Sequence, residues 1–161
     1  MEPLTIAEIV HQAIKHNLAL LRKNASCRAV LCPAVKADAY GHGIKQILPI
    51  LIEAGVERLA VAHLSEAIEI RQLGWPRPIL SFAPMLAGCS DAQCRERAEA
   101  AVSNQVSLTV MSENEAQMLE AVSHRLNQPA GVEIKVDTGM GRMGLHPDEA
   151  ERLVMAIAHS T

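Results

Sequence analysis

Two short stretches of the sequence combine chemically useful side chains with glycine. The first, VKADAYGHG (residues 35–43), places Lys36 at the end of an apolar run, and Tyr40, the only tyrosine of the chain, follows it among small residues. A lysine at the carboxyl end of a parallel strand points to the face where α/β proteins bind ligands, and partial desolvation makes its amine a usable nucleophile. Lys36 is therefore a candidate catalytic residue, with a solvated strand end as the alternative.

The second stretch, DTGMGRMG (residues 137–144), has its glycines at the G-x-G-x-x-G spacing of dinucleotide-binding loops. A dinucleotide site needs these glycines at the start of a helix, and an acidic residue about 20 positions later at the end of the next strand. Here the expected helix start, HPDEA, comes after the third glycine, and no strand pattern follows it. We therefore interpret the glycines as a loop that lets the backbone approach a ligand beside Arg142.

The rest of the sequence supplies elements that could position these stretches. Five apolar runs of strand length alternate with segments of helical period: residues 29–35, 58–64, 78–84, 106–112 and 131–137. Strands that are apolar throughout and separated by helices indicate a parallel sheet covered on both faces. We predict an α/β fold in which Lys36 follows the first strand and the glycine loop follows the fifth.

Three helix starts are marked by a hydroxyl residue followed three positions later by Glu or Gln: Thr5 with Glu8, Ser90 with Gln93, and Ser112 with Glu115. In each pair the hydroxyl can cap the helix while the longer side chain reaches back to the cap's own amide. The N-terminal segment is thus predicted to be helical from Thr5, with an apolar face that includes Ile14 and Leu18 packed on a sheet. The last helix should begin near Pro147.

Composition limits the class of protein. Apolar residues make up 49% and charged residues 20%, which is a globular composition, and no apolar run approaches the roughly 20 residues of a membrane-spanning helix. The N-terminus lacks the basic start and apolar segment of a secretory signal, so we expect a cytoplasmic protein without a membrane partner. A net charge of -3, with one Phe, one Tyr and one Trp, argues against nucleic acid as a partner.

The four cysteines form two pairs, Cys27 with Cys32 and Cys89 with Cys94, each with four residues between them. This is not the tight C-x2-C spacing of zinc sites, so we predict no metal and interpret the cysteines as buried, reduced thiols. The histidines are scattered without ligand spacing, and His42 is interpreted as structural.

Sequence period alone leaves two architectures open. Five strands would suit a complete doubly wound sheet, and they would also suit the first part of a closed eight-stranded barrel, which usually takes about 250 residues. No linker or low-complexity segment divides the chain, so residues 1–161 are treated as one unit.

Taken together, the two stretches resemble the alanine racemase family. VKADAYGHG and KVDTGMGRMG (residues 135–144) are similar to the motifs that follow the first and fifth strands of that family's N-terminal barrel, and residues 16–25, 60–74 and 78–80 also look familial. The resemblance implies that residues 1–161 are part of a pyridoxal-phosphate-binding domain, about five βα units of an incomplete TIM-type (β/α)8 barrel. The family's C-terminal β domain would be absent.

The resemblance also implies a role for each matching residue. Lys36 would bind pyridoxal phosphate covalently and act as one of two catalytic bases, and Tyr40 would bind the cofactor phosphate. Arg142 would contact the cofactor's phenolic oxygen and the substrate carboxylate, while Lys135 would orient Arg142, in the family often as a carbamylated lysine. The alternatives are a half-buried core tyrosine for Tyr40 and, for Lys135, an ordinary lysine paired with Glu133 or Asp137.

The implied reaction is amino-acid racemisation by a homodimer, with alanine or serine as substrate and D-alanine serving cell-wall precursor supply. The family's second base is a tyrosine of the C-terminal domain, contributed by the partner subunit, whereas Tyr40 is the only tyrosine here. We therefore expect the isolated chain to be inactive. Two alternatives are a non-catalytic protein or regulator that binds pyridoxal phosphate, and a complete doubly wound domain without a cofactor.

Overall fold

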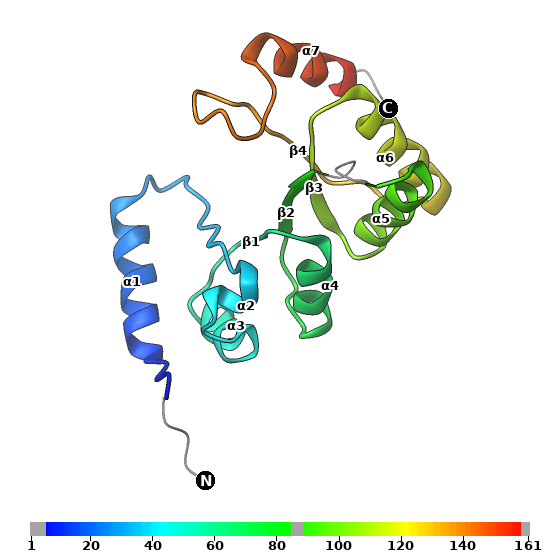
Figure 1. Ribbon diagram of the computed structural model, residues 1–161. Coiled ribbons are helices and arrows are strands. Elements are labelled where there is room, and N and C mark those ends of the chain that lie inside the picture. The colour runs from blue at the N-terminus through cyan, green and yellow to red at the C-terminus, as the bar shows by residue number, and fades with distance from the viewer. Residues whose placement is uncertain (1–5, 85–88, 159–161) are drawn as a thin grey trace.

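The computed structural model describes residues 6–84 and 89–158, and in these ranges seven helices alternate with four strands (Figure 1). The helices are α1 (His11–Asn24), α2 (Lys36–Tyr40), α3 (Ile44–Glu53), α4 (Leu64–Gln72), α5 (Asp91–Ser103), α6 (Glu113–Leu126) and α7 (Pro147–Ala158). The strands are β1 (Leu59–Val61), β2 (Ile79–Pro84), β3 (Val106–Val110) and β4 (Val132–Ile134). No helix of the described ranges has the length and apolar character needed to cross a membrane.

The four strands form one parallel sheet in the order β1-β2-β3-β4. Leu59 is aligned with Ile79, and Ile79 with Val106, so the register carries across the strands. A strand order that follows the chain without reversal is that of a barrel wall, whereas a doubly wound sheet reverses at a switch point. The predicted α/β fold with an incomplete parallel barrel is confirmed, and the doubly wound alternative does not match this order.

Residues 29–35 do not form the predicted first strand, so the prediction of five strands was wrong by one. This segment makes a single bridge, in which the amide of Val35 donates to the carbonyl of Ala60 at 2.8 Å and the amide of Ala60 donates to Pro33 at 3.1 Å. Pro33 has no N–H for the preceding ladder bond. The backbone then becomes left-handed at Ala37, so the pairing cannot extend in either direction.

The two faces of the sheet differ in what they contact. Side chains alternate between faces along a strand, and the helix-covered face buries Leu59, Val61 and Ile79 completely. The opposite face carries Ala60, Leu80 and Ser107, which are aligned in register. The helices therefore lie on the outside of a curved wall, as in a barrel (Figure 1).

The N-terminal segment differs from its prediction. Thr5 lies outside the described residues, and Ile6–Val10 are not helical, because α1 begins at His11. Helix α1 packs mainly against α3 and has no buried residue, although Ile14 and Leu18 are partly buried against the core. It lies to one side of α3 in Figure 1, so the prediction that it docks on the sheet was wrong. Ile6 and Val10 are exposed, so burial offers no driving force to extend the helix.

The other predicted helix starts are confirmed. The Ser90 hydroxyl accepts from the amide of Gln93, and the side chain of Gln93 accepts from the amide of Ser90. The Ser112 hydroxyl accepts from the amide of Glu115 at 3.2 Å. Helix α7 begins at Pro147 as expected.

The cysteines differ in part from the buried, reduced thiols predicted, although the predicted burial is confirmed for Cys94. Cys89 and Cys94 form a disulfide, whereas Cys27 and Cys32 are free and exposed. Cys89 directly precedes the N-cap of α5 and Cys94 is the fourth residue inside the helix. These two positions commonly contact each other as a hydrophobic staple, which is why the two sulfurs meet.

Candidate active site

Lys36 begins a short turn, α2, whose backbone is left-handed. The four residues from Ala37 to Tyr40 have φ between 51° and 56°, and none of them is glycine. Left-handed helical backbone costs an ordinary residue roughly 1–2 kcal/mol, so this turn stores on the order of 4–8 kcal/mol that the surrounding structure must offset. Such strain is typical of functional sites, where it fixes a side chain in one position.

Backbone hydrogen bonds within the turn, and a side-chain hydrogen bond at its end, hold it in place. Within the turn, the amide of Ala39 donates to Val35 at 2.9 Å, and the amide of Gly41 donates to Ala37 at 3.0 Å. At its end, the Asp38 carboxylate accepts from the amide of Ile44 at 2.7 Å and so caps α3. The Asp38 side chain therefore secures the exit of the turn.

His42 has the structural role predicted from sequence. Its Nδ1 lies 2.8 Å from the carbonyl oxygen of Ala39. A carbonyl only accepts, so Nδ1 carries the proton and the ring closes the turn. Nothing in this contact requires a catalytic histidine.

The turn brings Lys36 and Tyr40 together. The Lys36 Nζ lies 5.8 Å from the centroid of the Tyr40 ring, at the carboxyl end of the segment bridged to β1. Tyr40 is exposed, so the half-buried core tyrosine considered above is wrong. Among the described residues, neither the Lys36 amine nor the Tyr40 hydroxyl has a hydrogen bond or ion pair, so both are available to a ligand.

The glycine loop is closed by its own strand. Leu145 forms a bridge with Val136, because its amide donates to Lys135 and its carbonyl accepts from Asp137, both at 2.9 Å. A Cβ on Gly144 would lie 2.6 Å from the amide nitrogen of Asp137, and the φ of Gly144 is +134°. This glycine is therefore required by close backbone approach, and the loop precedes a helix rather than opening one.

Asp137 organises the inside of this loop. Its carboxylate accepts from the amides of Gly139 at 2.9 Å and Gly141 at 3.1 Å. These amide bonds lower the pKa of Asp137 below its usual range. The Asp137 carboxylate is thus occupied by hydrogen bonds within the loop. Arg142, in the same loop, is exposed.

Lys135 and Arg142 lie at the same edge of the sheet as Lys36. Both follow β4, and Lys36 follows the segment bridged to β1, so all three lie at the carboxyl end of the parallel sheet. In the described part of the chain no hydrogen bond or ion pair joins Lys36 to Lys135 or Arg142. Lys135 forms no ion pair there either, since Glu133 pairs with Arg58 and Asp137 binds the loop amides.

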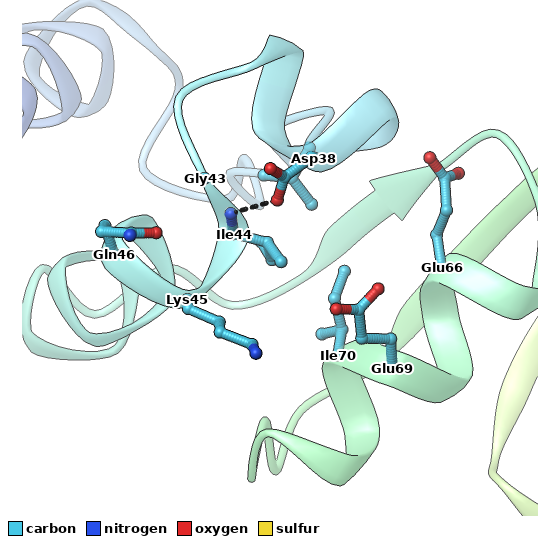
Figure 2. A pocket seen from close by; sticks show the side chains of 9 residues that line it. Asp38, Gly43, Ile44, Lys45, Gln46, Glu66, Glu69 and Ile70 are labelled. Carbon is cyan, nitrogen blue, oxygen red and sulfur yellow. Dashed lines mark hydrogen bonds between the residues drawn. The ribbon is translucent and has the colours of Figure 1, made fainter. Parts of the chain in front are cut away.

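A pocket lies beside this turn, between it and helices α3 and α4. It has a volume of about 370 Å³ and is lined by Asp38 of the turn, Lys45 of α3, and Glu66 and Glu69 of α4, among others. Figure 2 shows Lys45 extending from α3 toward α4, while Asp38 is bonded to the amide of Ile44. Lys36 and Tyr40 do not line it, so this pocket is not the predicted cofactor site.

Glu66 is a residue of this region that the sequence patterns missed. Its Oε2 accepts from the amides of Ala62 and His63, both at 2.9 Å, and its Oε1 accepts from the amide of Ala37 at 2.6 Å. The signal was available, because Glu66 stands three residues after the N-cap of α4, as Gln93 and Glu115 do in α5 and α6. The N-cap is His63, which the rule for hydroxyl caps does not select.

The family model and the curated relatives that match this chain point to the same family. Residues 9–161 match the family described as alanine racemase, N-terminal domain. The chain is 41% identical over 143 residues to the alanine racemase of Desulforamulus reducens, which covers 89% of this chain and 36% of the relative. It is 38% identical over 152 residues to that of Acidithiobacillus ferrooxidans, with 94% and 39% covered. The chain therefore spans little more than a third of the length of these curated relatives.

Solved structures agree in fold. The alanine racemase of Clostridium difficile 630 superimposes with a TM-score of 0.78 at 30% identity, over 94% of this chain and 37% of that one. A histidine racemase from Leuconostoc mesenteroides gives a TM-score of 0.77 at 23% identity, which shows a shared fold alone.

Proposed function

The chain belongs to the alanine racemase N-terminal domain family, and on that basis we propose that it is part of a pyridoxal-phosphate-dependent amino-acid racemase. The observation that carries the proposal is the strained turn that presents the Lys36 amine beside Tyr40, both without partners among the described residues. An amine that can bond to an aldehyde carbon and a phenol that can donate to a phosphate form a donor set that suits this cofactor. When bound, the cofactor supplies an electron sink that acidifies the α-carbon of an amino acid.

We assign the proton transfer on one face of the substrate to Lys36. Its amine would hold the cofactor and, once released, take or return a proton at Nζ. Tyr40, with its ring 5.8 Å from that nitrogen, would donate its hydroxyl to a phosphate oxygen. The left-handed turn fixes the separation between these two groups, which is the form of preorganisation that a covalent site requires.

Arg142 and Lys135 would act from the end of the sheet formed by β4, whereas Lys36 acts from the end formed by β1. The exposed Arg142 guanidinium can donate two parallel hydrogen bonds to a substrate carboxylate. Lys135 would orient that guanidinium in its carbamylated form, because the carbamate has negative acceptor oxygens whereas an ammonium group only donates. Its amine forms no ion pair within the described ranges. Contact between these groups and Lys36 would have to form when ligand binds, because apo catalytic contacts are often long.

The substrate is proposed to be alanine, with serine as the competitor to compare, in a cytoplasmic homodimer of the complete protein. The cytoplasm keeps thiols reduced, so Cys89 and Cys94 would be held there mainly as the dithiol. We further propose that the isolated 161-residue chain does not racemise, because the second base of the family lies in a C-terminal domain and Tyr40 is the only tyrosine here.

The test is an absorbance spectrum of the purified chain with pyridoxal phosphate, followed by borohydride reduction and peptide mapping. We expect the cofactor to be fixed on Lys36, and the Lys36→Arg variant to lose this labelling. The Lys45→Arg variant is the control, because Lys45 lies on α3 outside the proposed site. Labelling spread evenly over the lysines would count against the proposal, and racemisation by the chain alone would refute its predicted inactivity.

A further inference from the structure

Glu66 joins two elements that carry different parts of the site. It is the third residue of α4, and one of its carboxylate oxygens accepts from the amides of Ala62 and His63 at the start of that helix. This is an ordinary capping arrangement. The other oxygen reaches 29 residues back along the chain, to the amide of Ala37 at 2.6 Å.

The peptide that Glu66 binds is the one that links Lys36 to Ala37. Ala37 is the first residue of the left-handed turn, with φ of 51°. A residue with a side chain resists this conformation, and the amide bond to Glu66 is a charge-assisted contact from outside the turn itself. The carboxylate therefore holds the backbone directly at the point where the Lys36 side chain departs.

The neighbouring carboxylates do not provide this contact. Asp38 binds the amide of Ile44, which secures the far end of the turn. Glu69 stands one helical turn further along α4 and lines the same pocket, but it is exposed and has no hydrogen bond to the turn among the described residues. Figure 2 shows Glu66 and Glu69 projecting from the same helix below the turn.

We propose that Glu66 is a positioning residue for Lys36: by fixing the Ala37 amide to the start of α4, it sets where the Lys36 amine stands relative to Tyr40. This inference rests on the proposed function for its catalytic meaning, although the positioning itself is a property of the chain without cofactor. Glu66 does not touch the reacting atoms, and it acts through the backbone of the turn.

The test uses the full chain without cofactor and NMR, comparing wild type with Glu66→Gln and Glu66→Ala. We expect exchange of the Ala37 amide to accelerate roughly tenfold or more in Glu66→Ala, which removes its acceptor. The effect should be smaller in Glu66→Gln, whose single amide oxygen can accept on one side only. The nuclear Overhauser contact between the Lys36 methylenes and the Tyr40 ring should also weaken. Assignment is direct because the chain has one Tyr, one Phe and one Trp.

Two controls separate positioning from simple capping. Glu69→Gln removes a carboxylate from the same helix and should leave Ala37 exchange unchanged. Glu149→Gln removes the matching cap of α7, whose carboxylate accepts from the amide of His146 at 3.0 Å, and should affect α7 alone. In Glu66→Ala, faster exchange at Ala62 and His63 with unchanged exchange at Ala37 would reduce Glu66 to a helix cap and overturn the inference.

A last measurement distinguishes this inference from the proposed function. Pyridoxal phosphate labelling of Lys36, fixed with borohydride, should fall several-fold in Glu66→Ala relative to Glu69→Gln. If the wild-type chain shows no labelling of Lys36, the proposed function fails, and the cofactor-free NMR results still decide whether Glu66 positions the turn. If Glu66→Ala does not fold, Glu66→Met keeps a similar side-chain length without a carboxylate or amide oxygen and carries the same test.

Discussion

Arg58, directly before β1, forms an ion pair with Glu133 in β4, although β1 and β4 are the first and last strands in the order of the sheet. Three interstrand spacings of about 4.8 Å would separate these strands by roughly 14 Å in a flat sheet. The pair therefore forms across the concave face of a curved sheet. It ties the strand beside the Lys36 segment to the strand that leads to Lys135.

Removing one partner of this pair should destabilise the fold. The side chains of Arg58 and Glu133 are 26% and 40% exposed, and the Arg58 Nε is buried without a hydrogen-bond partner among the described residues. A partly buried pair lies between the surface and buried cases, so Glu133→Gln should lower the free energy of unfolding by about 1–2 kcal/mol. Urea unfolding measures this difference.

The matched control is Glu99→Gln, which breaks the more exposed pair of Glu99 with Arg125 between α5 and α6. It should cost less than about 1 kcal/mol. Equal losses in the two variants would show that the pair across the concave face has no special weight.

The same charges should tune the thiol of Cys32. Burial raises the pKa of Cys32 above its usual range, while Arg58 lowers the pKa and Glu133 raises it. Since the thiolate is the reactive form, Glu133→Gln should speed alkylation of Cys32 by iodoacetamide near pH 8, and Arg58→Met should slow it, each by roughly two- to threefold. Peptide mass spectrometry reads the rate, with Cys27 in the same sample as the internal reference. Identical Cys32 alkylation rates in the wild type and the two variants would show that Arg58 and Glu133 do not influence this thiol.

Acid should weaken the attachment of α1. A two-pronged bond from Arg22, at 2.7 Å to each carboxylate oxygen, and the amide of Leu31 lower the pKa of Glu57 from 4.5 to about 2. A lowered folded-state pKa stabilises the protein above the unfolded pKa, and this stabilisation is lost as the pH falls through the folded pKa. The gap in unfolding free energy between wild type and Glu57→Gln should therefore be full above about pH 5 and shrink between 4.5 and 2.

Thermal and urea unfolding at several pH values measure that gap. Glu99→Gln changes the net charge by the same amount at a site away from α1, so it corrects for the general effect of charge on acid stability. A gap for Glu57→Gln that stayed constant down to pH 2 would mean that Glu57 is not held as a paired carboxylate.

The parts of the fold that were predictable from sequence depend on local chemistry. Ser90 with Gln93, Ser112, and Pro147 each start a helix because the cap needs only residues within one turn. The disulfide could have been found the same way, since Cys89 and Cys94 occupy the staple positions of a helix start that was itself predicted.

The parts that were missed depend on distant contacts. Nothing local favours four left-handed residues without glycine after Lys36, and the turn is held partly by Glu66, 29 residues away. The first predicted strand fails for a related reason, because Pro33 removes a ladder donor and the turn ends the pairing after one bridge. Lys36, Lys135 and Arg142 all follow segments that end at the carboxyl edge of the sheet, and the distance between them depends on the curvature of the sheet.

Two glycines of the loop allow a test of why glycine is needed there, because they share a positive φ but differ in the space available for a side chain. Gly139 and Gly144 both have left-handed φ, +128° and +134°, so alanine is strained at either position. A Cβ at Gly139 would meet nothing within 4 Å, whereas at Gly144 it would lie 2.6 Å from the backbone nitrogen of Asp137. Gly139→Ala should therefore cost about 1 kcal/mol of unfolding free energy, and Gly144→Ala more than about 2 kcal/mol.

The added cost should be local to the strand that carries Lys135. In Gly144→Ala the backbone must shift where Leu145 bonds to Lys135 and Asp137, so the amides of Leu145 and Asp137 should exchange faster, while in Gly139→Ala they should stay protected. Arg142 lies between these two glycines, so only Gly144→Ala should also change how the loop presents its guanidinium. Equal effects of the two variants on stability and exchange would mean that backbone conformation alone, and not the close approach at Asp137, explains the glycine at position 144.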